Sequence, residues 1–156
     1  ETPEIIRRWR DTFACNCWNC DDDENFALWN IYLNKQTDGV CVVSSLEKLK
    51  NNFENTGEYI NGYFINYVNY GNNIDIFSPL ETVTTKYIWY NYENEFRFII
   101  NIKNNSNGIL ISIEPESIID KVILSPNISS EGREKVFKLM SKINLERELL
   151  QPGYVD

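Results

Sequence analysis

The sequence contains no histidine, and this absence excludes several classes of chemistry at once. Ser-His-Asp and Cys-His catalysis, the HExxH metal site and an imidazole general base all need a side chain that this chain does not supply. The phosphate-binding motifs GxxxxGK[ST] and GxGxxG are missing as well. Any catalysis by this chain would therefore depend on carboxylates, hydroxyls, thiols, lysine or arginine.

Long apolar runs are also missing from the sequence. No run reaches the roughly 18 apolar residues of a membrane-spanning helix, and no charged segment followed by an apolar one marks a signal peptide. We therefore expect a cytoplasmic protein without membrane contact. With 156 residues, 42% of them hydrophobic, residues 1–156 should form a single globular domain. Because the chain begins with Glu1 instead of Met, we expect that an N-terminal segment of the full-length protein is missing.

Positive charge is scarce, and the net charge is −8. Binding to a nucleic-acid backbone needs clustered lysine and arginine, so nucleic acid is disfavoured as the partner and a nucleotide or a protein is the better expectation. The one basic cluster comprises Arg7, Arg8 and Arg10. It is interpreted as the solvated face of an N-terminal helix, with an anion or nucleotide contact as the alternative.

The four cysteines follow the pattern CxCx2C with a distant fourth member: Cys15, Cys17, Cys20 and Cys41. This is not the paired CxxC spacing of most structural zinc sites. In a strand, Phe13, Cys15 and Cys17 would share one face, which favours buried thiols that act as small core side chains. A zinc site and disulfides stay open as alternatives.

Apolar periodicity and turn residues predict an α+β fold with a largely antiparallel sheet of five or six strands and three or four packed helices. The segment Phe26–Leu33 should form a helix capped by the preceding aspartates, and Ser44 with Glu47 should cap the next helix. Asn61-Gly62 predicts a tight hairpin turn in a tyrosine-rich segment, whose tyrosines are read as sheet-packing aromatics or, alternatively, as a stacking platform. The remaining predicted helices are 3–10, 46–53, 115–119 and 130–143, and the predicted strands are 12–18, 40–43, 95–102, 109–113 and 122–124, with 80–92 either helix or strand.

The segment KYIWYNYENEFR, residues 86–97, carries the most informative pattern. In a strand, Glu93, Glu95 and Arg97 would line one face while the alternate apolar residues from Phe96 to Ile102 fill the other. This row of charges has three interpretations. It is a salt-bridged strand face, a site for glycosyl transfer or glycoside hydrolysis, or a metal-dependent site that uses the two carboxylates.

Several motifs together resemble a bacterial family of uncharacterised domains from conflict and phage-defence loci. The family has an NCW strand, an MWxxY helix, a GI-like strand that ends in Ser-Thr, and a strand with a lysine followed by ExExR. The resemblance covers about residues 13 to 145 and implies an architecture but no established activity. The matching positions here are Asn16-Cys17-Trp18, Glu24, Ala27, Trp29, Tyr32, Gly39 through Ser44-Ser45 to Leu49, Lys86 through Arg97, and Val122 through Pro126.

A weaker resemblance concerns the chemistry. Glu93-Asn94-Glu95 is similar to the ExE of ADP-ribosyltransferases, which implies that Glu95 stabilises an oxocarbenium-like transition state and that Glu93 orients the acceptor. Ser44 looks like the serine that such folds place beside NAD. The resemblance thus implies catalytic roles for Glu95, Glu93 and Arg97, ligand binding by Ser44, Trp29 and Tyr32, and NAD as the cofactor. The family's first-motif arginine or histidine has no certain counterpart here, and a non-catalytic interaction or effector domain is the alternative.

Overall fold

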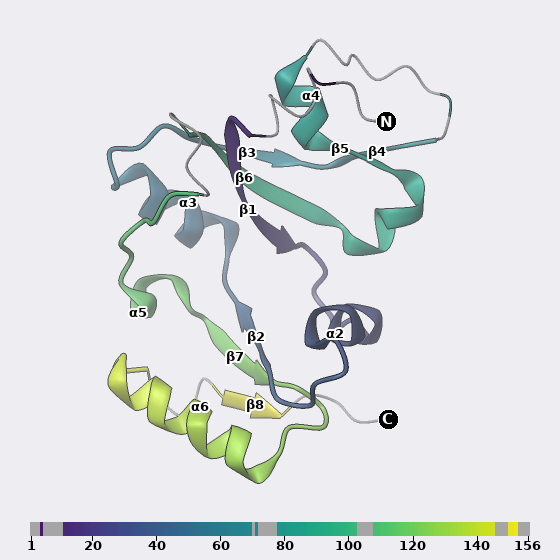
Figure 1. Cartoon of the computed structure of the whole chain (residues 1–156). Helices are drawn as coiled ribbons and strands as arrows, with labels where there is room; N and C mark the ends of the chain where they lie inside the picture. Colours follow the sequence, from purple (N-terminus) through teal and green to yellow (C-terminus); the bar gives the residue numbers. More distant parts are fainter. Residues whose placement is uncertain are drawn as a thin grey trace. The chain divides into compact units, whose positions relative to one another are not determined.

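A computed structural model of the chain describes residues 4, 11–69, 71, 78–102, 108–145 and 150–152. The fold is α+β, with short helices and several small, largely antiparallel sheets (Figure 1). The predicted class is thus confirmed, although the strands are divided among small sheets instead of one larger sheet. The chain forms two compact units, the first from residues 1–21 and 57–111 and the second from residues 22–56 and 112–156. The predicted helix 3–10 and its arginines lie outside the described residues, apart from Glu4.

The first unit is built around strand β6 (Glu95–Asn101). This strand lies between β1 (Phe13–Asn19) and β3 (Ile60–Phe64) and is antiparallel to both. Neighbours on both edges satisfy the backbone groups of β6, so its apolar sequence can be buried. The alternate apolar residues from Phe96 to Ile100 are buried as predicted, whereas Ile102 follows the end of the strand.

The predicted hairpin turn at Asn61-Gly62 and the predicted strand 109–113 are both wrong. Asn61-Gly62 is not a turn but lies inside β3, where a Cβ on Gly62 would come within 2.4 Å of Cζ of Phe96. Glycine is needed there for close packing, not for a turn. Residues 109–113 form no strand, because both edges of β6 are already paired with β1 and β3.

The ambiguous segment 80–92 contains both kinds of structure. Helix α4 (Pro79–Thr84) begins after Ser78, whose side chain accepts a hydrogen bond from the Glu81 amide at 3.2 Å. Strand β5 (Thr85–Tyr87) follows and pairs in parallel with β4 (Asn66–Val68). The 3₁₀ helix η1 (Ile88–Glu93) then leads to Asn94, which has left-handed backbone angles and turns the chain into β6.

The second unit packs helices with a separate three-stranded sheet. In that sheet β7 is antiparallel to β2 and parallel to β8. The buried apolar residues of this unit come from α3, β7, α6 and the segment just after α6, and they include Leu49, Phe53, Leu124 and Met140. The elements of the unit are α2 (Phe26–Leu33), β2 (Val40–Val43), α3 (Leu46–Glu54), α5 (Pro115–Ile118), β7 (Lys121–Leu124), α6 (Ser130–Lys142) and β8 (Leu150–Pro152).

The caps of helices α2 and α3 differ from the prediction. Helix α2 is capped by Asn25, which follows the acidic run, and α3 is capped by Ser45 instead of Ser44. The last helix is capped by Ser129. The amide and the hydroxyl of Ser129 donate hydrogen bonds to the carboxylate of Asp38, at 2.8 Å and 2.9 Å. In the described part of the chain, every helix is too short or too polar to cross a bilayer.

Candidate functional site

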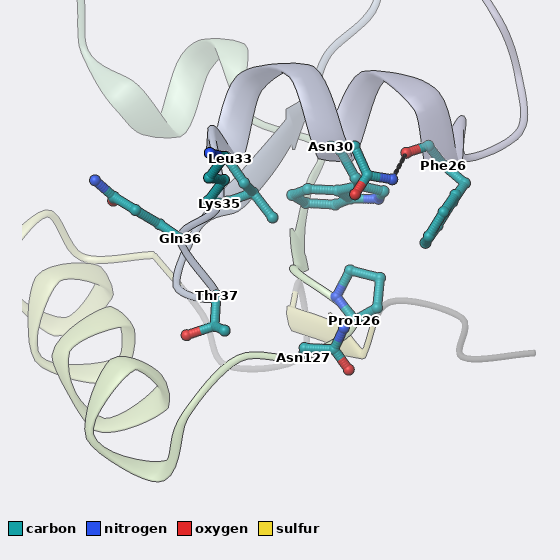
Figure 2. Close-up of a pocket in the computed structure, with 9 residues that line it drawn as sticks. Phe26, Asn30, Leu33, Lys35, Gln36, Thr37, Pro126 and Asn127 are labelled. Atoms are coloured by element: carbon teal, nitrogen blue, oxygen red, sulfur yellow. Dashed lines mark hydrogen bonds between the residues drawn. The ribbon is translucent and has the colours of Figure 1, made fainter.

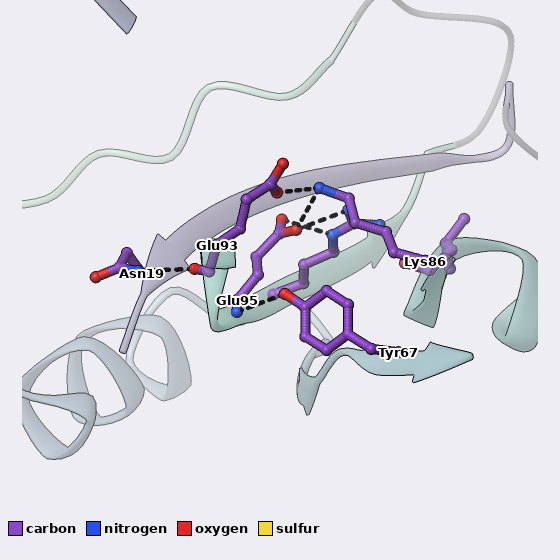
Figure 3. A network of polar contacts seen from close by, with 7 residues as sticks. Asn19, Tyr67, Lys86, Glu93 and Glu95 are labelled. Atoms are coloured by element: carbon purple, nitrogen blue, oxygen red, sulfur yellow. Dashed lines mark hydrogen bonds and ion pairs between the residues drawn. The ribbon is translucent and has the colours of Figure 1, made fainter. Parts of the chain in front are cut away.

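The charged residues of segment 86–97 come together in one cluster of the first unit. Glu95 and Arg97 lie on the same face of β6, and Cys17 of β1 is directly opposite Arg97. Lys86 reaches the cluster from β5, and Glu93 reaches it from the end of η1 (Figure 3). We call these five residues the ion cluster.

Glu95 is at the centre of the ion cluster and is only 6% exposed. Arg97 donates to both of its carboxylate oxygens, with Nε to Oε1 at 2.7 Å and Nη2 to Oε2 at 3.0 Å. Lys86 Nζ is 2.8 Å from Oε2, and the thiol of Cys17 on β1 contributes to the lowered pKa of the carboxylate. The strong acceptor positions of this carboxylate are therefore largely occupied by partners within the protein.

This environment keeps Glu95 ionised. Burial alone raises the pKa of a carboxyl group, but the hydrogen bonds from Arg97, Cys17 and Lys86 outweigh it and bring the pKa of Glu95 to about 2. The carboxylate in turn raises the pKa of Arg97, although burial works in the opposite direction. Glu95 is thus a fixed anion at neutral pH, not a group prepared to exchange a proton.

Glu93 joins the cluster from a position that the strand pattern did not predict. It ends η1, and the left-handed Asn94 separates it from β6, so Glu93 does not share the strand face with Glu95. Its carboxylate nevertheless pairs with Lys86. Desolvation lowers the pKa of Lys86, but the hydrogen bonds that its ammonium group donates to Glu93 and Glu95 outweigh desolvation and raise it. Two anions and two cations thus neutralise one another.

Two further groups close the cluster from outside β6. Arg97 Nη1 donates to the carbonyl oxygen of Val83 in α4, and the hydroxyl of Tyr67 accepts a hydrogen bond from the Glu95 amide at 2.9 Å (Figure 3). Desolvation raises the pKa of Tyr67. Tyr67 was predicted only as one of several sheet aromatics, because nothing in a tyrosine-rich segment distinguishes the member that reaches β6.

The cysteines are not core thiols, contrary to the prediction. All four are exposed. For Cys15 and Cys17 the reason is that β1 is an edge strand and their face is the charged face of the sheet. Even so, partial desolvation, together with the hydrogen bond to Glu95 and its negative charge, raises the pKa of Cys17 to about 12. Desolvation also raises the pKa of Cys15, Cys20 and Cys41. Cys17 therefore acts as a protonated donor.

A metal site would require several ligating side chains directed at one point. Among the residues that the structure describes, no group of three or more cysteine, aspartate or glutamate side chains has this arrangement. Glu93 and Glu95 both face Lys86, and the cation that they share is this ammonium group. A neutralised pair of this kind offers little attraction to a metal ion.

The predicted ligand-binding residues Trp29, Tyr32 and Ser44 all belong to the second unit. Trp29 donates from Nε1 to Glu24 at 2.9 Å and lines a pocket of about 230 Å³ between α2 and the segment after β7 (Figure 2). Tyr32 is 77% exposed and Ser44 is half-buried, and neither lines this pocket. The pocket is smaller than the roughly 300–1,000 Å³ that is typical of small-molecule sites.

No protein-family model matches the chain, and no curated protein or solved structure shows significant similarity to it. The resemblances to a bacterial conflict family and to ADP-ribosyltransferases therefore stay predictions.

Proposed function

We propose that this chain is a non-catalytic interaction domain of a bacterial or phage conflict system, and that its ExE carboxylates are structural. One observation carries the proposal: the buried carboxylate of Glu95 is bound by Arg97 and Lys86 at the same time. A catalytic carboxylate must direct its charge at a substrate, whereas this charge is directed at neighbours within the fold. The setting in phage defence or counter-defence rests on the sequence resemblance alone.

A second candidate is an ADP-ribosyltransferase-like or NAD glycohydrolase-like enzyme. The low pKa of Glu95 supports it, because stabilising an oxocarbenium-like transition state requires an ionised carboxylate at neutral pH. Catalysis would then require Arg97 or Lys86 to move away and expose that carboxylate to NAD. The non-catalytic proposal is preferred because it needs no such movement.

The substitution Glu95→Gln separates the two candidates, since it keeps the shape of the side chain and removes its charge. If Glu95 is structural, the wild type consumes no NAD with any acceptor, and the variant has a clearly lower melting temperature because Arg97 is left buried without its anion. If Glu95 is catalytic, the wild type consumes NAD and the variant loses turnover at a nearly unchanged melting temperature. That second result would overturn the preferred proposal.

Glu54→Gln is the matched control for this experiment. Glu54 also pairs with a cation, Lys50, but the two side chains are 64% and 67% exposed and their charged atoms are 3.8 Å apart. Exposed pairs of this kind contribute little, so the control should leave the melting temperature unchanged. An equal fall in both variants would show that loss of charge in general, and not the ion cluster, is responsible.

A further inference from the structure

The strongest remaining feature is the pocket of the second unit, which we call the α2 pocket. Its apolar part comes from one face of α2, where Phe26, Trp29 and Leu33 occupy successive turns, and from Pro126, which lies below this helix (Figure 2). Trp29, Leu33 and Pro126 are half-buried, whereas Phe26 is 72% exposed. The α2 pocket thus has an apolar floor and a phenyl ring at its edge.

The two sides of the α2 pocket are tied to each other. Ser125, which is 1% exposed, donates from its amide to the carbonyl oxygen of Gly39 at 2.9 Å and from its hydroxyl to that of Thr37. The Ile128 amide donates to the Ser125 carbonyl oxygen at 3.1 Å and closes the turn that carries Asn127. These bonds join the loop after α2 to the segment after β7, so the pocket is formed before a ligand arrives.

The rim of the α2 pocket is polar and carries a cation. Lys35 is the one charged side chain among the described residues that line the pocket. Within the part of the chain that the structure describes, the side chains of Lys35, Gln36 and Asn127 form no hydrogen bond or ion pair. All three are exposed, so their polar groups can bind a ligand.

The backbone that brings Lys35 to this rim is strained. Asn34 and Lys35 both have left-handed angles, with φ of 45° and 70°. Asparagine often ends a helix in this way, but a second left-handed residue that is not glycine is uncommon and costs free energy. Glycine at position 35 would avoid this cost. Strain of this kind gathers at functional sites, which favours a role for the lysine side chain in the pocket.

The charge of the lining residues selects the class of ligand. The chain has 23 acidic residues, yet none of the described residues that line the pocket is acidic. The indole N–H of Trp29 donates to Glu24 at 2.9 Å, so Trp29 contributes apolar ring surface to the pocket and no donor. A ligand that matches this lining has an apolar ring and a negative charge at the end that meets Lys35.

We propose that the α2 pocket binds a small aromatic carboxylic acid. The ring lies on the apolar floor at Trp29 and Pro126, and the carboxylate accepts a charge-assisted hydrogen bond from Lys35. The volume of about 230 Å³ limits the ligand to a single ring system, because larger molecules need larger sites. This inference concerns the second unit and does not depend on the role of the ion cluster.

The experiment titrates phenylacetate into the full chain and follows the amide resonances of the lining residues by NMR spectroscopy. Phenylacetate should bind with millimolar affinity, as expected for so small a ligand, and phenylacetamide, its neutral counterpart, should bind roughly tenfold more weakly. Lys35→Met should abolish this difference between the two probes. Lys50→Met, the matched substitution of an exposed lysine in the same unit, should leave it unchanged. Phe26→Ala should weaken both probes to the same extent.

Lys35→Gly separates a binding role of this lysine from a structural one. Glycine relieves the left-handed strain, so the variant should keep or raise the melting temperature of the wild type. At the same time it should lose the preference for phenylacetate over phenylacetamide. A clear fall in the melting temperature would show that Lys35 serves the fold, and would overturn its assignment to the ligand.

Three other outcomes would overturn the proposal. The first is that no lining residue responds to millimolar phenylacetate. Equal binding of phenethylamine, a cation with the same ring, would show that the pocket does not select a negative charge. Tighter binding of adenosine monophosphate than of phenylacetate would identify a nucleotide site instead. None of these results touches the non-catalytic proposal, which fails only if the wild type turns over NAD and Glu95→Gln abolishes that turnover.

Discussion

The four charged residues of the ion cluster and the exposed run Tyr87–Tyr92 come from the same twelve residues, 86–97, yet their burial is the reverse of the usual order. The carboxylate of Glu95 is only 6% exposed, whereas Trp89, six residues earlier, is 68% exposed. Charged residues are normally outside unless they are paired, and large aromatic residues are normally well buried. In this segment the charged side chains are buried or half-buried because they neutralise one another, and the aromatic side chains from Tyr87 to Tyr92 are exposed.

The contrast indicates where stability resides. Charged groups that are largely removed from water and paired with one another tie β5, η1 and β6 together. Exposed aromatic rings contribute less to folding, because they bury less apolar surface. Substitutions in the ion cluster should therefore change stability more than substitutions in the exposed run Tyr87–Tyr92.

The largest effect is expected for Arg97→Met. This change keeps the length of the side chain but leaves Glu95 buried without its two-point partner, which should lower the free energy of unfolding by about 3–5 kcal/mol. Chemical denaturation measures the change. Lys50→Met, the same kind of substitution in an exposed ion pair, should stay within about 0.5 kcal/mol. Similar values for the two variants would mean that the ion cluster is not special.

Acid should weaken the same cluster. The folded-state pKa of Glu95 is depressed from 4.5 to about 2, so its contribution is fully present above pH 4.5 and is lost as the pH falls toward 2. The shift corresponds to about 3 kcal/mol of stability. Unfolding of the wild type and of Glu95→Gln across this range measures it, since only the wild type carries the Glu95 contribution. Parallel curves for the two proteins would contradict the prediction.

The apolar face of β6 offers a test that leaves the charges intact. In Gly62→Ala the new Cβ would lie 2.4 Å from the Phe96 ring, which is itself packed edge-on against Phe64 and Phe98. The ring has little room to move, so we expect a loss of about 2 kcal/mol in denaturation experiments. Gly39→Ala meets only the flexible end of the Leu33 side chain and should cost less.

Substitutions of Cys17 test how much this uncharged neighbour of Glu95 contributes to stability. Cys17→Ala removes a donor to a buried carboxylate and should lower stability by about 1 kcal/mol, while Cys17→Ser retains a donor and should recover most of it. With its pKa raised to about 12, the thiol should also react slowly with alkylating reagents at neutral pH until the protein is unfolded. Fast labelling of folded protein at Cys17 would argue against the hydrogen bond.

The smallest effect on stability is expected for the exposed residue Trp89. Trp89→Ala should change the free energy of unfolding by no more than about 0.5 kcal/mol, because an exposed ring loses little on truncation. This prediction sharpens the comparison when it is read beside Arg97→Met in the same denaturation series. A large destabilisation by Trp89→Ala would show instead that this exposed ring contributes to the packing of the first unit.

Most secondary structure could be predicted because its signals are local. The apolar run of β6, the boundaries of β2 and the serine-started helix α6 all follow from a few adjacent residues. The prediction of a hairpin turn at Asn61-Gly62 was wrong because the same dipeptide also occurs in tightly packed strands. The close contact between Gly62 and the ring of Phe96 is not visible in the local sequence. The pairing of β6 with β1 and β3 depends on contacts that are distant along the chain.

The candidate site was predictable in part. Alternation along β6 placed Glu95 and Arg97 on one face. Lys86 was only a position of the family motif and was not predicted as a site residue, although it pairs with Glu95. The hydroxyl of Tyr67 and the carbonyl of Val83 gave no signal, because their role depends on how β4 and α4 lie against β6. The burial of the cysteines was misjudged for a similar reason, since sequence does not reveal that β1 is an edge strand.

The sequence by itself determined the types of chemistry available, the α+β class and the alternation that pairs Glu95 with Arg97. These follow from composition and from the period of side chains along a strand, which are properties of neighbouring residues. Only the tertiary structure decided that the carboxylate is saturated and that the aromatics of the same segment face water. Burial and pairing depend on the positions of residues far apart in the chain, and the left-handed turn at Asn94 is where the segment changes from its exposed part to its buried part.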